Sequence, residues 1–170
     1  MMQQEESFEV VDPNGKVMGT ARRAELHRNP SLIHRVVHVL VFNLQDLLLL
    51  QKRSRNKDTA PGTWDTSVGG HVDIGEDIRS AALRELREEL AIEGCTVNFL
   101  YEYLFSNQQE TELVSTFTCV HSGPFRFNRE EIDDVRFWRI DEIRVQLDSG
   151  KFSDHFIEEF RRYGKFRIRR

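Results

Sequence analysis

The chain has 170 residues, with 24 Lys and Arg against 28 Asp and Glu, which gives a formal net charge of −4. This length fits one domain, because domains commonly run to about 100–200 residues. Twelve Phe and two Trp exclude a disordered chain, and the mildly acidic balance argues against broad nucleic-acid binding, which needs a basic surface. We therefore expect a single folded domain over residues 1–170, with no specific nucleic-acid partner.

Cysteine usage and the N-terminal residues favour a cytoplasmic protein. Cys95 and Cys119 belong to no C-x-x-C pattern, so neither a zinc site nor a redox pair is suggested, and we expect reduced thiols. Residues 1–6 are polar and acidic, unlike a signal peptide. No apolar run approaches the roughly 20 residues that span a bilayer, so we expect no membrane partner.

The predicted elements alternate between strands and helices. Turn residues at Asp12-Pro13-Asn14-Gly15 separate two apolar runs and predict a hairpin over about residues 8–19, followed by strands over residues 34–42 and 47–51. Residues 52–75 are expected to be irregular, because Pro61-Gly62 and Gly69-Gly70 interrupt them. A helix is predicted over residues 78–90, strands over residues 96–104, 113–120 and 135–140, and a last helix over roughly residues 153–163. This alternation predicts a mixed α/β domain.

The predicted helix over residues 78–90 carries an unusual group of carboxylates. Glu85, Glu88 and Glu89 stand at i, i+3 and i+4 beside the apolar stripe, where like charges repel one another. They form either a solvated acidic face, screened by neighbouring arginines, or a site for a divalent cation such as Mg²⁺, which prefers oxygen ligands. A backbone carbonyl beside Gly70 adds another oxygen, since glycine lets the chain approach closely.

The residues from 70 to 92 resemble the signature of the Nudix hydrolases. The consensus G-x5-E-x7-R-E-U-x-E-E-x-G-U, with U a bulky aliphatic residue, is matched except at its last glycine, where this chain has Ala91. The resemblance implies an α/β/α sandwich, in which a mixed sheet lies between helices and the motif forms a catalytic loop–helix–loop. It further implies a hydrolase that cleaves a diphosphate with Mg²⁺ or Mn²⁺. The residues that it assigns to metal and catalysis are Gly70, Glu76, Arg84, Glu85, Glu88 and Glu89, with Glu85 and Glu89 as principal ligands and Arg84 orienting a glutamate.

A second group of residues resembles one branch of this family, the type I isopentenyl diphosphate isomerases and their hydrolase-like relatives. In the isomerases three histidines and two glutamates hold a divalent metal. Glu110 and Glu112 are two positions apart, so both side chains point to one face of an extended segment. Imidazoles with carboxylates suit Mn, Fe or Zn better than Mg. The matching positions are His27, His34, His71, Glu110 and Glu112, with Glu112 also a candidate base.

The isomerase interpretation meets one obstacle. The isomerases have a cysteine acid/base where this chain has Gly69, and glycine offers no proton. The hydrolase carboxylates are retained in full, so we expect hydrolysis of a nucleoside diphosphate or a related small-molecule diphosphate. The alternatives are an isomerase-like enzyme and a non-catalytic diphosphate-binding module.

Several other residues are open to two interpretations. Trp64 either stacks on a substrate ring or anchors its loop, and Arg53 and Lys57 either contact phosphate or lie in a solvated turn. His38 is expected to be a packed strand histidine, and nothing in the sequence suggests a role for His121 or His155. Four aromatic residues are expected to build the core, with a homodimer contact as the alternative: Phe125, Phe127, Phe137 and Trp138.

Overall fold

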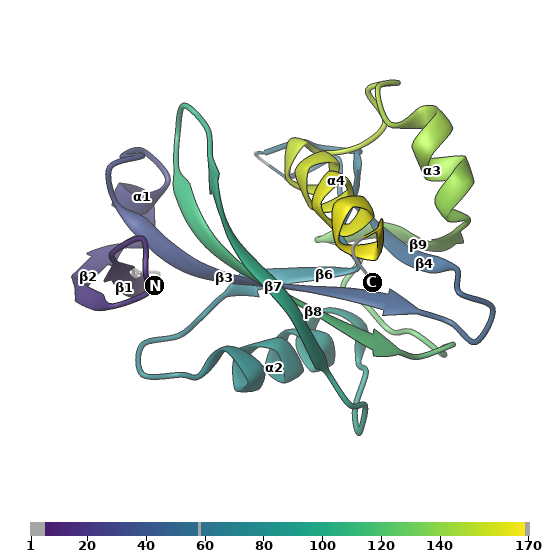
Figure 1. The fold of residues 1–170 in the computed structure, drawn as a ribbon, viewed down its shortest axis with the longest axis horizontal. Coiled ribbons are helices and arrows are strands. Elements are labelled where there is room, and N and C mark those ends of the chain that lie inside the picture. Colours follow the sequence, from purple (N-terminus) through teal and green to yellow (C-terminus); the bar gives the residue numbers. More distant parts are fainter. Residues whose placement is uncertain (1–5, 58, 169–170) are drawn as a thin grey trace.

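The computed structural model describes residues 6–57 and 59–168 (Figure 1). Residues 1–5, on which part of the expectation about the N-terminus rests, lie outside this description. The predicted hairpin is present as β1 (Ser7–Val11) and β2 (Val17–Arg22), and a single helical turn, α1 (Arg23–Leu26), follows it. The turn of this hairpin is closed by Asp12, whose side chain accepts hydrogen bonds from the backbone of Asn14 and Lys16.

A long strand, β3 (Ile33–Phe42), is the centre of the sheet. It pairs in parallel with β8 (Thr111–Val120) over its whole length and in antiparallel fashion with β6 (Val68–His71). β7 (Asn98–Ser106) extends the sheet beyond β8, while β4 (Leu48–Arg53) pairs with β5 (Trp64–Asp65) and with β9 (Ile132–Trp138). Parallel and antiparallel pairs in one sheet confirm the predicted mixed α/β architecture.

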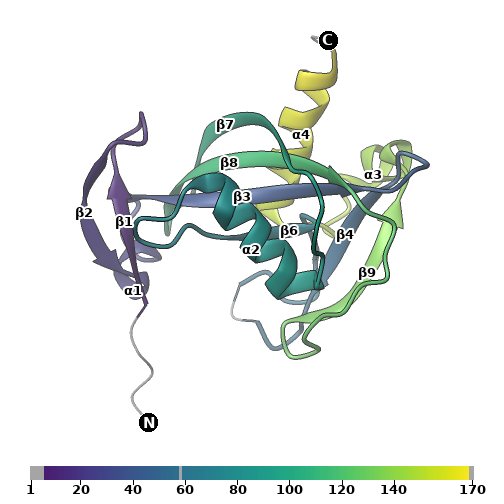
Figure 2. The same cartoon turned by 90° about the horizontal axis from the view of Figure 1, so that it is seen from below.

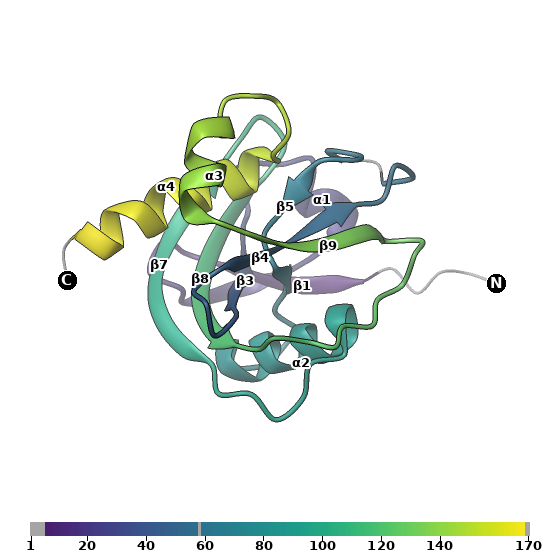
Figure 3. The same ribbon diagram turned by 90° about the vertical axis from the view of Figure 1, so that its right-hand side faces the viewer.

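Helices cover both faces of the sheet (Figures 1 and 3). α2 (Ile78–Leu90) lies on one side, whereas α3 (Ile140–Gln146) and α4 (Asp154–Ile168) lie on the other. Viewed from below, α2 stands in front of β3 and β8, and α4 stands behind them (Figure 2). The alternation of β3 explains this arrangement, because Val37, Val39 and Val41 pack in the α2 core while Leu40 and Phe42 pack in the α4 core.

The helix α2 has the bounds that the sequence predicts, and both of its ends have a physical cause. Asp77 caps the N-terminus by accepting hydrogen bonds from the backbone N–H groups of Arg79 and Ser80. At the C-terminus Ala91 adopts a left-handed conformation with φ of 54°, and its N–H bonds back to the carbonyl of Arg87. Ala91, at the position of the consensus glycine, therefore has a backbone conformation that glycine adopts more readily.

The prediction that residues 52–75 are irregular is wrong at two places, since β5 and β6 lie within them. Two glycines give β6 little intrinsic strand preference, so a local pattern could not reveal it. β6 is a strand because its backbone pairs with β3, from Val36 opposite His71 to Val39 opposite Val68. The helices α1 and α3 are also absent from the predicted elements, and both are short.

The aromatic residues with two interpretations belong to the core. Trp138 is buried among Phe152 and Phe156 beneath α4, and Phe125, Phe127 and Phe137 pack against the cluster beneath α2. Both cysteines are free thiols, as expected. Among the described residues, no helix is both long and apolar enough to cross a membrane.

Candidate functional site

Arg84 is the centre of an ion-pair network on α2. Its Nε and Nη2 donate to the two carboxylate oxygens of Glu76 at 3.0 and 2.8 Å, and Nη1 donates to Glu85 at 2.6 Å and Glu88 at 3.2 Å. Nη2 also donates to the backbone carbonyl of His71 at 2.8 Å. A planar guanidinium can fix several carboxylates at once because its donors form a rigid fork. The predicted orienting role of Arg84 therefore has a geometric basis.

Gly70 allows the carboxylate of Glu85 to lie directly against β6. A Cβ atom at Gly70 would stand 2.1 Å from Glu85 Cδ, so no other residue fits without displacing the glutamate. Burial raises the pKa of Glu85 above its ordinary value, although the hydrogen bond from Arg84 opposes this shift. A carboxylate held beside a glycine backbone in this way is suited to share a cation with the nearby carbonyl.

Glu89 is a second carboxylate that lines the same cavity as Gly70 and Glu85. It accepts hydrogen bonds from Gln51 Nε2 at 2.9 Å and from the backbone N–H of Gly69 at 3.3 Å. Burial and the charge of Glu85 raise the pKa of Glu89 to about 8, despite these two donors. Burial and mutual repulsion disfavour the ionised forms of such neighbouring carboxylates, and a bound cation would compensate for both effects.

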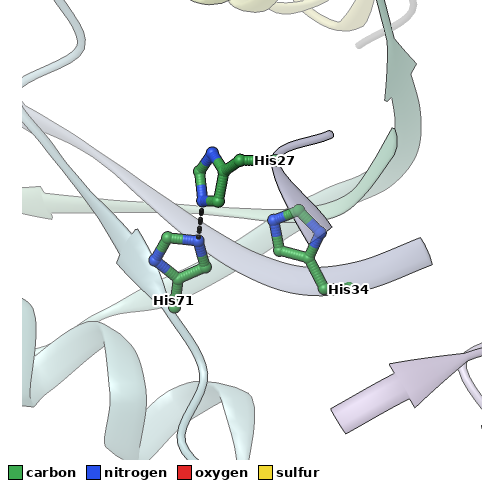
Figure 4. A group of neighbouring side chains, drawn as sticks. All are labelled: His27, His34 and His71. Carbon is green, nitrogen blue, oxygen red and sulfur yellow. Dashed lines mark hydrogen bonds between the residues drawn. The ribbon is translucent and has the colours of Figure 1, made fainter. Parts of the chain in front are cut away.

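Three histidines from separate elements meet on the other side of β6 (Figure 4). His27 is the C-cap residue that follows α1, His34 lies in β3 and His71 ends β6. The Nε2 atoms of His27 and His71 are 3.3 Å apart, and the rings of His34 and His71 stack with their centroids 5.1 Å apart. One potential ligand atom from each of the three lies within 4.8 Å of the others, as the predicted metal site requires.

His34 presents the clearest sign of a missing partner. The residue is fully buried, yet neither ring nitrogen has a hydrogen-bond partner among the described residues. Burial lowers the pKa of His34, and burial is also the main cause that lowers the pKa of His71 to about 3. Both imidazoles are therefore neutral near pH 7 and keep the lone pairs that metal ligation needs.

Glu110, in the turn between β7 and β8, and Glu112, near the start of β8, extend this cluster. The register of β8 on β3 places Glu112 opposite His34, and Glu110 Oε2 lies 2.7 Å from His27 Nδ1. One oxygen from each glutamate lies within 4.8 Å of a His34 nitrogen and of the other. The five residues that sequence resemblance selected are thus brought together, and the His34 nitrogens, which have no hydrogen bond among the described residues, are suited to bind a divalent ion.

His155 also belongs to this cluster, although no sequence pattern indicates it. Its Nε2 lies 3.2 Å from Glu112 and 3.7 Å from Glu110, and its ring packs on Phe105. Burial lowers the pKa of His155, but the hydrogen bond with Glu112 and the negative charges of Glu112, Asp65 and Glu110 together outweigh burial and raise the pKa to about 9. Because His155 begins α4, far along the chain from the other ligands, only the tertiary fold places it here.

One cavity of about 650 Å³ joins the carboxylates of α2 to the His/Glu cluster. β6 separates the two groups, since Gly70 faces Glu85 while its neighbour His71 faces the histidines. The predicted site residues that line the cavity are His27, Arg53, Lys57, Gly70, His71, Arg84, Glu85, Glu88, Glu89, Glu110 and Glu112.

Three predicted site residues do not belong to the described lining of this cavity. His34 is fully buried and is not exposed to the cavity. Both carboxylate oxygens of Glu76 accept hydrogen bonds from Arg84. Trp64 packs edge-on against Trp138, with ring centroids 5.2 Å apart, which favours the anchoring role over stacking on a substrate. Arg53 and Lys57 do line the cavity, where they pair with Asp65 and Glu131, respectively.

Comparison with known proteins agrees with this geometry. The family described as NUDIX domain matches residues 32–160. An isopentenyl-diphosphate Delta-isomerase of Streptomyces avermitilis is 34% identical over 156 residues, covering 88% of this chain and 79% of its own. An uncharacterised Nudix hydrolase of Pseudomonas aeruginosa is 36% identical over 129 residues, covering 76% of each chain.

Solved structures of low sequence identity have the same fold. DR0079 from Deinococcus radiodurans superposes with a TM-score of 0.80 at 24% identity, covering 92% of this chain and 98% of its own. The Nudix domain of NrtR from Shewanella oneidensis, solved with ADP-ribose, gives a TM-score of 0.61 at 16% identity, covering 78% and 86%. The chain belongs to the Nudix family, as its motif predicts. Its enzyme class is that of a Nudix pyrophosphohydrolase.

Proposed function

We propose that this protein is a metal-dependent hydrolase that cleaves the diphosphate linkage of a nucleoside diphosphate or a nucleoside diphosphate-linked compound. The observation that carries the proposal is the contact between Gly70 and Glu85, because it leaves this carboxylate beside a backbone strand at the wall of a large cavity. Glu88 and Glu89 line the same cavity, so oxygen ligands from three glutamates and one carbonyl are available to Mg²⁺ or Mn²⁺.

The residues of the chain have separate roles in this proposal. Glu85, Glu89 and Glu88, with the Gly70 carbonyl, would hold the metal, which when bound neutralises phosphoryl oxygens and acidifies a water. Arg84 orients Glu85, and Glu76 fixes Arg84 from the other side. A carboxylate, Glu112 or one of the α2 glutamates, accepts the proton of the attacking water. Arg53 and Lys57 provide cations for the phosphates at the cavity wall.

The test is the release of orthophosphate or nucleotide from a panel of nucleoside diphosphates, nucleotide sugars, dinucleotides and isoprenoid diphosphates, with Mg²⁺ and Mn²⁺ supplied separately. Glu85→Gln and Glu89→Gln keep the side-chain volume and remove the charge, so we expect either to abolish turnover. Glu93→Gln, just beyond α2, is the control and should turn over normally. Unchanged turnover in the two variants overturns the assignment.

We also propose a second divalent metal, held by His27, His34, His71, Glu110 and Glu112. The buried nitrogens of His34, which have no hydrogen-bond partner among the described residues, support it. Titration with Co²⁺, followed by its visible absorption, tests this site independently of activity, because imidazole ligands change the cobalt spectrum. His34→Ala should remove the histidine-dependent band, while His121→Ala should keep it. A spectrum identical in both variants contradicts the second site.

The relative from Streptomyces avermitilis makes an isoprenoid diphosphate isomerase the second candidate function. Gly69 opposes this candidate, since it offers no ionisable side chain in the cavity wall. Exchange of solvent deuterium into isopentenyl diphosphate would favour isomerisation, and its absence alongside diphosphate hydrolysis would exclude it. Tight binding of a nucleotide without turnover under either metal would instead favour a non-catalytic binding module.

A further inference from the structure

The first turn of α4 holds His155 in a fixed place beside the cavity. The backbone N–H of Ser153 donates to the carbonyl of Trp64 in β5 at 2.9 Å, and the Ser153 hydroxyl accepts from the backbone N–H of Phe156 at 3.1 Å. The ring of His155 packs on that of Phe105 in β7, with centroids 4.1 Å apart, and His155 lines the cavity. Both the backbone and the ring of His155 are therefore constrained before any ligand arrives.

The Nε2 atom of His155 faces both glutamates of the His/Glu cluster. It lies 3.2 Å from Glu112 Oε2 and 3.7 Å from Glu110 Oε1. The other two oxygens face the histidines, since Glu112 Oε1 lies 3.8 Å from His34 Nε2 and Glu110 Oε2 lies 2.7 Å from His27 Nδ1. Each glutamate therefore has one oxygen toward His155 and one toward a proposed metal ligand.

This division of the oxygens matters because both glutamates are buried. Their side chains are only 8% and 7% exposed, so water does little to screen the repulsion between Glu110 and Glu112. A hydrogen-bond donor that faces both carboxylates offsets this repulsion and restricts their rotation. The oxygens on the far side are then held toward the histidines, where a divalent ion would lie.

Two features indicate that His155 supports the glutamates and does not bind the ion. An ionised carboxylate only accepts hydrogen bonds, so His155 can hold Glu112 only through a proton on Nε2, and a protonated nitrogen has no lone pair for a metal. Among the described residues, the groups of potential ligand atoms that lie within 4.8 Å of one another include the other five residues of the cluster but not His155.

We propose that His155 is a positioning residue for the second metal site, where its Nε2–H holds Glu110 and Glu112 so that one oxygen of each faces the histidines. The inference rests on the second metal under the proposed function, and it adds a residue to that site from a separate element, α4. Groups that orient metal-ligating carboxylates typically contribute about 10–100-fold to metal affinity.

The decisive comparison is between His155→Leu and His155→Gln. Leucine has no donor, whereas glutamine can place an amide N–H near the position of Nε2. Co²⁺ affinity is read from the histidine-dependent absorption band. We expect His155→Leu to lose about 10–100-fold in affinity and to shift the band, and His155→Gln to keep most of the affinity. Phe105→Leu, which removes the ring that packs on His155 but no donor, is the matched control and should bind Co²⁺ as the wild type does.

A measurement on the wild type keeps the inference testable if His155→Leu does not fold. In protein with ¹⁵N-labelled histidine, titration with Zn²⁺ should shift a ring nitrogen of His34 strongly, because that nitrogen binds the metal. His155 Nε2 should keep its directly bonded proton in the Zn²⁺-loaded protein, which its one-bond coupling reveals. Loss of that proton on loading would mean that His155 is itself a ligand, and it would overturn the inference.

The two proposals fail in different ways. If the wild type shows no histidine-dependent band with Co²⁺, the second metal site is wrong, and the role of His155 with it. If the band is present, three results overturn the role of His155 alone: wild-type affinity in His155→Leu, an equal loss in His155→Gln, or an equal loss in Phe105→Leu. The hydrolase assignment is tested separately, by turnover of the variants at Glu85 and Glu89.

Discussion

Arg84 donates two hydrogen bonds to the carboxylate of Glu76, from Nε at 3.0 Å and from Nη2 at 2.8 Å. The two residues are eight positions apart along the chain. This pair ties the loop before α2 to the middle of the helix. Because the third nitrogen of the same guanidinium donates to Glu85, the position of a predicted metal ligand depends on Glu76, which is not itself free to bind metal.

The first prediction concerns Arg84→Lys. Lysine keeps the positive charge but has no fork, so it cannot hold Glu76 and Glu85 together. Supporting residues of metal sites typically contribute about 10–100-fold to metal affinity or activity, and we expect a loss of that size in Mn²⁺ affinity, measured by paramagnetic resonance. Arg87→Lys, at an exposed neighbouring position, is the matched control. Equal Mn²⁺ affinities in both variants would contradict the role of the fork.

The second prediction concerns Gly70→Ala. The new methyl group would stand 2.1 Å from Glu85 Cδ, so the carboxylate must move. Displacement of a catalytic group by about 1 Å can cost on the order of 10²-fold in rate, and we expect a loss of at least that size. Gly19→Ala is the control, since a Cβ there meets nothing within 4 Å. Steady-state turnover on the preferred diphosphate measures both, and normal turnover of Gly70→Ala would refute the predicted contact.

The third prediction concerns Ala91→Gly. Ala91 has φ of 54°, a conformation that costs an L-residue more than it costs glycine. After subtraction of the extra entropy that glycine loses on folding, we expect a gain of about 0.5–1 kcal/mol in the free energy of unfolding. Urea unfolding measures it. Ala91→Val, with a branched side chain in the same conformation, should be less stable than the wild type, and a stability order that is reversed would rule out this explanation.

The fourth prediction concerns acid stability. Burial alone would raise the pKa of Glu159, but the hydrogen bond and charge of His38, together with the hydrogen bonds from Tyr101 and Tyr103, outweigh burial, and the folded-state pKa lies below the ordinary value of 4.5. A group with a depressed folded pKa stabilises the fold fully above its unfolded pKa and loses this contribution as pH falls through the folded value. The stability difference between wild type and Glu159→Gln should therefore be constant near neutral pH and shrink below about pH 4.5.

The measurement is urea unfolding of both proteins between pH 3 and pH 7. Glu158→Gln, the neighbouring position on α4 where Glu158 pairs with Arg162, serves as the control for a partly exposed carboxylate. A difference that grows toward low pH would mean that Glu159 is protonated in the folded protein.

The features best predicted from the sequence are those determined by residues close together in the chain. The bounds of α2 follow from its apolar spacing and from its N-terminal Asp77, and both causes lie within a few residues of the helix. The five residues of the His/Glu cluster were selected by resemblance to a family, and the structure brings them within reach of one another. Composition alone would have left each histidine unassigned.

Pairings between distant parts of the chain could not be predicted. β6 is a strand through its partner β3, and its own residues carry no strand signal. His38 and Glu159 are separated by 121 positions, and His155 reaches Glu112 from the start of the last helix. The two side-chain contacts depend on how α4 packs across the sheet, which no periodicity in the sequence specifies.

β6 is only four residues long, yet consecutive positions of this strand serve opposite sides: Gly70 faces the helix carboxylates and His71 faces the histidines. A slip of one position against β3 would exchange the two faces and dismantle both clusters together. The register of this one short strand thus positions both the α2 carboxylates and the His/Glu cluster. We therefore expect insertions and deletions to be tolerated in the loops around β6 but not within the strand.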